Sequence, residues 1–313
     1  MIDSKKIRII YMGTPQMSAE LLEHLIASQY NIVGVVSQVD QKVGRKQLIQ
    51  EVPTKLVARK YGIPVFQPIK IKHDFEFMAG LKVDLILCFA YGQIIPEEVL
   101  RMPKFGALNY HGSILPKYRG AAPIQYALMN NDEESGVCLM EMVKKMDAGK
   151  VFALEKFPLL TSDNYETTAQ KIVEAAKKIT DKYLQDYVNN KLQGVAQNEA
   201  LVTFAPSIKS EEERINLDLD YKQIFGLIRA LSPHIGAYVL YKDQALKIFE
   251  STIVDETQNH EIGSIIKADK TGLFVQFKGG VLALNVLQKA GKKRVGFKDF
   301  INGEKDLLET KVF

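Results

Sequence analysis

The chain has 313 residues, 46% of them hydrophobic and 25% charged, which is the composition of an ordinary folded protein and leaves room for a second domain. Its 41 basic and 37 acidic residues leave a net charge of only +4, so overall charge does not indicate a nucleic-acid partner. The two cysteines and five scattered histidines show no metal-ligand spacing, so we expect no metal. No apolar run has the length of a membrane span, and the N-terminus leads straight into a predicted strand. We therefore expect a cytoplasmic protein with no membrane partner.

The first part of the chain predicts alternating strands and helices. Residues 7–12 are an apolar run that ends at Gly13, and apolar residues at helical spacing follow. Further buried strands are predicted over 31–37 and 84–90, with a helix over 53–61 between them. This order indicates an α/β fold with a Rossmann-like, mainly parallel sheet. A dinucleotide fingerprint needs more glycines after the first strand than the single one present, so we expect no NAD.

Between the second strand and that helix, residues 38–52 form a polar and basic stretch to which we assign no secondary structure. Loops of this length inside a compact α/β domain are usually functional or disordered. Gly44 gives the backbone freedom here, and Arg45 and Lys46 carry positive charge beside it. A solvated loop without function is the alternative.

The stretch 106–120 combines polar residues in a way that a generic turn does not. A predicted strand over 106–111 carries Asn109 and His111, which share a face because side chains two apart on a strand point the same way. Glycine and proline then end that strand, so the pair lies at a strand end, where open α/β sheets bind their ligands. Asp147 follows downstream among apolar residues. Taken alone, an Asn-x-His pair is more often a turn former and a packed imidazole.

The remainder of the chain predicts a second domain. Strands are predicted over 135–142 and 151–159, and a long amphipathic helix within 163–192. After a turn-rich stretch come a helix over 221–231 and short strands over 237–241, 246–249, 263–266, 273–277 and 281–287. Frequent turn signals between short strands are typical of a small, OB-like β-barrel. We therefore predict a first domain over 1–190, a linker over 191–208 and a C-terminal barrel domain over 209–313.

A cluster of basic residues lies in the last part of the chain: Lys289, Lys292, Lys293, Arg294 and Lys298. Basic clusters bind nucleic-acid phosphates. A run of charge is as often only a solvated face, and the residues alone leave both interpretations open.

One motif carries a family resemblance: Asn109-x-His111-x-Ser113-x-Leu115-Pro116-x-x-Arg119-Gly120, with Asp147-x-Gly149 downstream. It resembles the signature of the folate-dependent formyltransferases. The rest of the chain is similar to the methionyl-tRNA formyltransferases of that family, at Gln38-x-Asp40-x-x-x-Gly44-Arg45, Ala205-Pro-Ser-Ile-Lys209 and Leu287-Gln288-x-Ala290-Gly291-Lys292-Lys293-Arg294. Two tryptophans usual in their second domain are missing, at Asn216-Leu217 and at His234. These departures concern tRNA contact and not the Asn, His and Asp set.

The resemblance implies a reaction. A formyl group passes from the co-substrate 10-formyltetrahydrofolate to the amino group of initiator methionyl-tRNA, for initiation of translation. In this acyl transfer Asn109 and a cationic His111 stabilise the oxyanion that develops. Asp147 favours the charged imidazole and relays protons from nucleophile to leaving group.

The resemblance also implies binding residues and partners. The folate pocket is lined by Ser113, Ile114, Leu115 and Pro116, and the loop over 89–96 surrounds the pterin. The acceptor end of the tRNA is entered by Arg45, with Lys46 beside it, and its backbone is held by Lys292, Lys293 and Arg294. We expect the protein to be a monomer.

Two other functions remain open. A sugar-nucleotide amine formyltransferase shares the catalytic domain, but the segment from Gln288 to Arg294 argues against it. A non-catalytic RNA-binding relative is the second, and the intact set of Asn109, His111 and Asp147 argues against that one.

Overall fold

The computed structural model describes residues 1–43 and 47–313 and divides into two compact units. The first unit comprises Met1–Ala121, Glu134–Phe157 and Ala169–Ala205. The second comprises Ala122–Glu133, Pro158–Thr168 and Pro206–Phe313. The domain bounds expected from the sequence, 1–190, 191–208 and 209–313, stay a prediction.

The first unit is built on a seven-stranded sheet with the order β5-β2-β1-β6-β7-β8-β9. Its strands are β1 (Ile9–Gly13), β2 (Ile32–Val36), β5 (Val65–Phe66), β6 (Leu85–Phe89), β7 (Ala107–His111), β8 (Glu134–Glu141) and β9 (Val151–Pro158). The pairs from β5 to β7 are parallel, and β8 runs antiparallel to β7. This confirms the predicted Rossmann-like, mainly parallel sheet.

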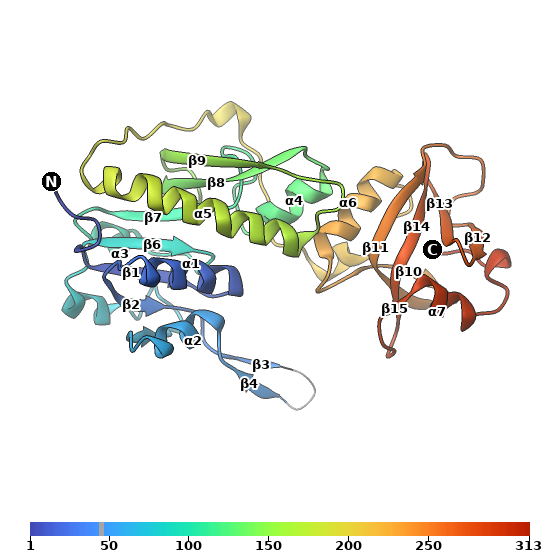
Figure 1. Cartoon of the computed structure of the whole chain (residues 1–313), viewed down its shortest axis with the longest axis horizontal. Coiled ribbons are helices and arrows are strands. Elements are labelled where there is room, and N and C mark those ends of the chain that lie inside the picture. The colour runs from blue at the N-terminus through green and yellow to red at the C-terminus, as the bar shows by residue number, and fades with distance from the viewer. Residues whose placement is uncertain (44–46) are drawn as a thin grey trace. The chain divides into compact units, whose positions relative to one another are not determined.

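Helices flank this sheet: α1 (Gln16–Ala27), α2 (Pro53–Lys60), α3 (Glu97–Arg101) and α5 (Tyr165–Val188). In Figure 1, α1 and α5 cross the same face of the sheet, and His24 of α1 lies 2.8 Å from Asp181 of α5. The face of α1 turned to the sheet carries leucines that are fully buried, Leu21, Leu22 and Leu25, each contributing about 1.5–3 kcal/mol by leaving water. The predicted long helix is confirmed with shorter ends.

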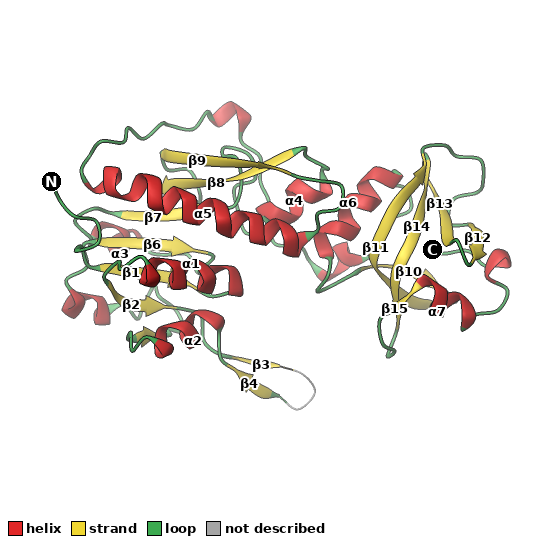
Figure 2. Ribbon diagram, in the orientation of Figure 1, coloured by secondary structure: helices red, strands yellow, loops and turns green. Residues whose placement is uncertain are grey.

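The stretch 38–52, expected to lack secondary structure, contains a short hairpin. Its strands are β3 (Gln41–Val43) and β4 (Leu48–Gln50), with Lys42 opposite Ile49. Figure 2 shows them as a ribbon separate from the main sheet. Polar composition obscured the strands in the sequence, because a two-stranded ribbon has no buried face to impose apolar alternation; Leu48 and Ile49 are exposed.

The second unit is a small barrel. Its six-stranded sheet has the order β10-β11-β14-β13-β12, with β15 paired to β14. The strands are β10 (Ala237–Tyr241), β11 (Gln244–Asp255), β12 (Ile265–Asp269), β13 (Gly272–Phe277), β14 (Gly280–Lys289) and β15 (Val295–Gly296). Residues near the end of the chain close the sheet, since Val312 bridges to Tyr241 of β10 and Lys311 bridges to Ser264 just before β12. The last residues therefore link the β10 edge of the sheet to the chain just before β12, and the predicted barrel is confirmed.

Helices α4 (Pro123–Met129), α6 (Tyr221–Leu231) and α7 (Phe297–Asn302) complete the second unit. Arg229 of α6 is buried, and its guanidinium donates to the carbonyls of Leu128 at 3.3 Å and Leu160 at 2.9 Å. It also donates to the side-chain oxygen of Asn131 at 3.1 Å. These bonds explain why two segments that are distant in sequence belong with the barrel: one cation satisfies carbonyls from both.

Candidate active site

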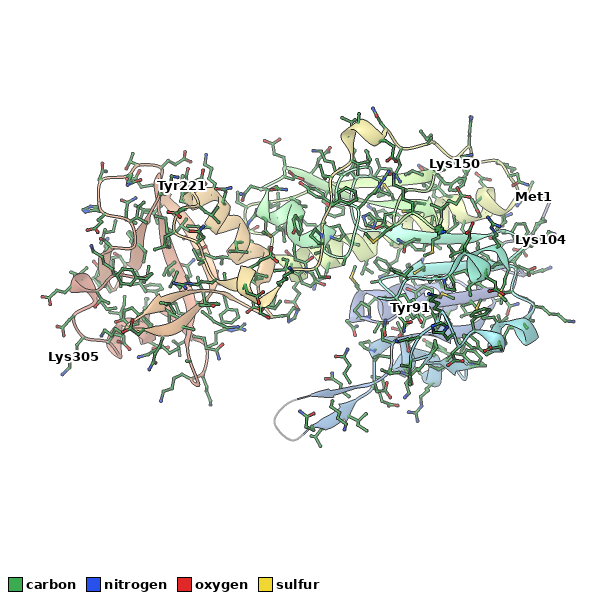
Figure 3. All side chains as sticks on the ribbon, turned by 180° about the vertical axis from the view of Figure 1, so that it is seen from behind. Met1, Tyr91, Lys104, Lys150, Tyr221 and Lys305 are labelled. Carbon is green, nitrogen blue, oxygen red and sulfur yellow. The ribbon has the colours of Figure 1, made fainter. Side chains whose placement is uncertain are left out.

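The parallel strands of the first unit bring several loops together at their carboxyl ends. Thr14, after β1, donates its hydroxyl to the carbonyl of Tyr91, after β6, at 2.9 Å. Gln38, after β2, donates its side-chain amide to the same carbonyl at 3.3 Å and its backbone N–H to the Thr14 hydroxyl at 3.1 Å. Tyr91 is labelled in Figure 3. Because β7 lies next to β6, its last residue, His111, lies at this same edge, where open α/β sheets bind ligands.

Asn109 and His111 both belong to β7. Asn109 lies in register with Cys88 of β6 and Met140 of β8 and is partly exposed. His111 lies opposite Cys138 and is 4% exposed. Two residues apart on a regular strand, the two side chains face the same side of the sheet.

The His111 ring is held on both sides. Its Nε2 lies 2.9 Å from the carbonyl oxygen of Tyr118, and its Nδ1 lies 3.6 Å from Oδ2 of Asp147. The structure therefore brings together His111 and Asp147, which the sequence separates widely.

Asp147 is itself fixed by the loop that follows β7 and carries motif residues 112–120, here called the motif loop. Its Oδ2 accepts the backbone N–H of Gly120 at 2.9 Å. The backbone of Asp147 has a φ of +48°, a left-handed conformation that is uncommon outside glycine and that Asp and Asn adopt more readily than other residues. Gly120 has a φ of +128°, and a Cβ there would lie 2.6 Å from the carbonyl oxygen of Ala205. Only glycine fits that position, and this accounts for its place in the motif.

The residues expected to bind folate form the loop after His111. The hydroxyl of Ser113 donates to the carbonyl of Lys117 at 2.6 Å, so it closes the loop on itself. Ile114, Leu115 and Pro116 are partly buried and give the loop an apolar surface.

A segment that sequence reasoning treated as linker packs directly on this loop. Arg119 pairs its backbone N–H with the carbonyl of Thr203 at 2.9 Å, and its own carbonyl accepts the N–H of Ala205 at 2.8 Å. The Arg119 side chain is 1% exposed and donates to Gln197 and Glu199. No pattern in the sequence indicated this contact, because Gln197 and Glu199 lie about 80 residues after Arg119 in a stretch without periodicity.

The residues predicted to bind tRNA belong to two separate stretches of the sequence. Arg45 and Lys46 lie outside the described residues. Lys292 and Lys293 are exposed in the turn between β14 and β15, in the second unit. Arg294 follows them, but its guanidinium lies 3.4 Å from the ring centre of Phe249 and donates to the carbonyl of Pro233 at 2.8 Å.

The two cysteine thiols are the remaining candidates for a nucleophile. Cys88 and Cys138 are free and buried, and burial raises the pKa of their thiols to about 12 and about 11. Neither thiol is therefore a ready nucleophile at neutral pH.

Among residues 1–43 and 47–313, no three His, Cys, Asp or Glu side chains form a group that could hold a metal ion. Within that part of the chain no helix is long and apolar enough to cross a membrane.

Comparison with known proteins identifies the family on both parts of the chain. Residues 5–184 match the formyl transferase family, and residues 207–305 match the formyl transferase C-terminal domain. The chain is 40% identical to the methionyl-tRNA formyltransferase of Lactobacillus acidophilus over 299 residues, covering 95% of each chain. It is 39% identical to that of Staphylococcus epidermidis over 308 residues, covering 97% of this chain and 99% of the relative.

Solved structures share the fold at lower identity. HypX from Aquifex aeolicus in complex with tetrahydrofolic acid matches with a TM-score of 0.66 at 16% identity, over 94% of this chain and 47% of that one. An N-formyltransferase from Helicobacter canadensis in complex with folinic acid and dTDP-3-aminofucose matches with a TM-score of 0.63 at 19% identity, over 90% and 99%. By its identity to the curated relatives across nearly its whole length, the chain belongs to the methionyl-tRNA formyltransferase family.

Proposed function

We propose that this chain transfers the formyl group of 10-formyltetrahydrofolate to the amino group of methionyl-initiator-tRNA, with Asn109, His111 and Asp147 acting on the reacting atoms. Family membership makes it a formyltransferase acting on methionyl-tRNA, an enzyme of translation initiation. One observation supports the residue roles above all: the His111 ring lies between the Tyr118 carbonyl and the Asp147 carboxylate. The cytoplasmic location and the monomeric state remain predictions.

The partners of His111 determine which ring nitrogen works. A backbone carbonyl only accepts hydrogen bonds, so the Nε2 that faces Tyr118 carries a proton in every state of the ring. The exchangeable proton therefore belongs to Nδ1, the nitrogen that faces Asp147. When Nδ1 is protonated the ring is a cation beside a carboxylate, and when it is not, Nδ1 can accept a proton. His111 thus serves as a proton donor and acceptor at one defined atom.

The reaction needs charge stabilisation and proton movement. As the amine attacks the formyl carbon, negative charge develops on the formyl oxygen, and preorganised donors there are each worth about 10²–10³ in rate. Asn109 supplies an amide donor at the strand end and His111 supplies Nδ1–H. Nitrogen-10 of the folate then leaves with a proton, and Asp147 relays protons between amine, imidazole and leaving group. The nucleophile is the amine, so no covalent enzyme intermediate is required.

The folate lies on the loop that follows His111. Its apolar surface, from Ile114 to Pro116, suits the flat ring system, and the loop over 89–96 flanks it. Ser113 contributes by shaping the loop through its bond to the Lys117 carbonyl. The co-substrate is therefore bound mainly through loop shape and backbone groups.

The tRNA is bound through two sets of cations. Arg45 and Lys46 belong to the sequence stretch 38–52. The described ends of that stretch are fixed because Asp40 accepts the N–H of Val52 at 3.2 Å and pairs with Lys55 at 2.5 Å. Lys292 and Lys293 are exposed and suit contacts to the phosphate backbone.

The test is transfer of labelled formyl from 10-formyltetrahydrofolate to three acceptors: charged initiator tRNA, charged elongator methionyl-tRNA and a nucleotide-linked amino sugar. We expect efficient transfer to the initiator tRNA, slower transfer to the elongator and none to the sugar. Preference for the sugar would contradict the proposed substrate, and absence of transfer to any acceptor would contradict the proposed activity.

A further inference from the structure

Gln197 connects the two parts of the site from outside the motif. Its side-chain amide nitrogen donates to the carbonyl of Asp147 and to the carbonyl of Gly149, each at 2.8 Å. Its side-chain oxygen accepts from Nε of Arg119 at 3.1 Å and from Nη2 of Arg119 at 2.9 Å. One side chain therefore joins the arginine of the motif loop to the loop that carries Asp147.

The partners fix the orientation of this amide. A guanidinium only donates and carbonyls only accept, so the oxygen of Gln197 must face Arg119 and its nitrogen must face Asp147. Arg119 is held in turn, because it is buried, its backbone pairs with Thr203 and Ala205, and its guanidinium pairs with Glu199 at 2.7 Å. The Gln197 amide therefore connects the buried guanidinium of Arg119 to the backbone of the loop that carries Asp147.

The backbone conformation at Asp147 benefits from contacts that hold it. Asp147 adopts a φ of +48°, a left-handed conformation that aspartate tolerates better than most residues but that still costs free energy, so contacts that hold it contribute to its geometry. The side chain of Asp147 is anchored by the N–H of Gly120, and Gln197 anchors the backbone on the other side. With both anchors in place, Oδ2 is held 3.6 Å from Nδ1 of His111.

We propose that Gln197 is a positioning residue for the formyl transfer: through Arg119 it holds the Asp147 backbone in the conformation that presents the carboxylate to His111. The inference rests on the proposed function, because it assumes that Asp147 acts in the reaction. It gives a positioning role to a residue of the stretch predicted from the sequence as a linker, which the structure places in the first unit.

The primary test is Gln197→Glu. A glutamate retains the size of the side chain and its bond to Arg119, but its carboxylate cannot donate. A second acceptor oxygen then faces the carbonyls of Asp147 and Gly149. We expect kcat to fall about 10- to 100-fold, because an interaction that positions a reacting group acts on the chemical step. KM for folate and for tRNA should stay within about twofold. The uncharged variant Gln197→Met removes the donation and also the acceptor for Arg119, and it should lower kcat at least as much.

The matched control is Gln185→Glu. Gln185 of α5 also donates its side-chain amide to a backbone carbonyl, that of Ile2, at 2.7 Å, and accepts the N–H of Ser4 at 2.9 Å. The chemical change is identical but remote from Asp147, and kcat should be unchanged.

A double-mutant cycle with Asp147→Asn separates positioning from general weakening of the fold. If Gln197 acts through Asp147, adding Gln197→Glu to Asp147→Asn should lower kcat by less than threefold more. Fully additive losses, or normal kcat in both Gln197 variants, would overturn the inference. Normal kcat in Asp147→Asn itself would instead reject the role of Asp147 in the proposed function, so the two failures are distinguishable.

Discussion

The motif loop of the first unit and the basic turn of the second unit hold their polar groups in opposite ways. In the motif loop, His111 and Arg119 are 4% and 1% exposed, and each has named partners within the fold. In the basic turn between β14 and β15, the side chains of Lys292 and Lys293 are exposed, and the turn is shaped by bonds to the backbone of Lys292. There the N–H of Lys292 donates to the carbonyl of Lys289 at 3.0 Å, and its carbonyl accepts from Gln288 at 2.8 Å.

The difference predicts how each region responds to substitution. A buried network with one geometry loses function steeply, because removing one partner displaces the others and leaves polar groups unsatisfied. Exposed cations act through a field that several of them share, so each contributes little and salt weakens all of them. Substitutions at the two regions should therefore differ in size and in salt dependence.

The largest effect is expected at the reacting groups. His111→Ala and Asp147→Asn should each lower kcat about 10²-fold or more, because both remove a group that acts in the transition state. Asn at 147 can still accept the N–H of Gly120, so this variant tests the charge and not the loop. Single-turnover formyl transfer measures the chemistry, and tetrahydrofolate binding should persist.

The control for these variants is His24→Ala. This imidazole also lies beside an aspartate, Asp181, at 2.8 Å, but on helices away from the strand ends. Its loss should leave kcat unchanged. Near-normal turnover in His111→Ala would reject the mechanism.

The second-largest effect is expected at Arg45, in the stretch 38–52. Arg45→Lys should lower kcat/KM for initiator tRNA about tenfold, towards the elongator value, because lysine lacks the planar fork with which arginine bonds and stacks on bases. The KM for folate should not change. Steady-state kinetics on both tRNAs measures this, with Lys42→Arg as a charge-conserving control in the same stretch of sequence. Equal proportional losses on both tRNAs would show that the stretch only attracts RNA in general.

The fold and the central pair could be predicted because they depend on short-range pattern. Apolar runs with glycine ends marked the parallel strands, and the period of two put Asn109 and His111 on one face of β7. The barrel followed from short strands with frequent turns. The strands, the shared face of the pair and the turns could be predicted because each depends on residues that are close in the sequence.

The remainder depends on contacts between distant segments. Nothing around Gln197 or Thr203 in the sequence indicates that they bond the motif loop, since they lie in irregular backbone without periodicity. Likewise, closure of the barrel by Val312 and the stacking of Arg294 on Phe249 need the tertiary fold. The sequence showed Arg294 only as one more positive charge in a cluster.

That stacking divides the basic cluster into two kinds of residue. Lys292→Glu with Lys293→Glu should raise the KM for tRNA a few-fold and flatten its salt dependence, by about one unit of log–log slope per lost phosphate contact. The melting temperature should hardly change. Arg294→Ala should instead lower the melting temperature, because Arg294 contacts Phe249 and Pro233. Kinetics at several salt concentrations and thermal melts separate the two; an unchanged slope in the lysine variant would identify the cluster as a solvated face.

The smallest effect is a pH dependence of stability at the outer end of the Arg119 network. Hydrogen bonds from Arg119, and then from Lys145, lower the pKa of the Glu199 carboxyl from 4.5 to about 2. Because the pKa is lower in the folded state, the stabilisation is fully present above pH 4.5 and is lost as the pH falls towards 2. The melting temperature of the wild type should exceed that of Glu199→Gln by a small margin at pH 6, since this carboxylate is exposed and screened. That margin should shrink by pH 3. Glu134→Gln, which removes an exposed carboxylate paired with Lys156, is the control and should show a smaller margin at pH 6. A margin for Glu199→Gln that is the same at both pH values would mean that the Arg119 network does not depend on this charge, and that its hold on Gln197 comes from burial and backbone pairing.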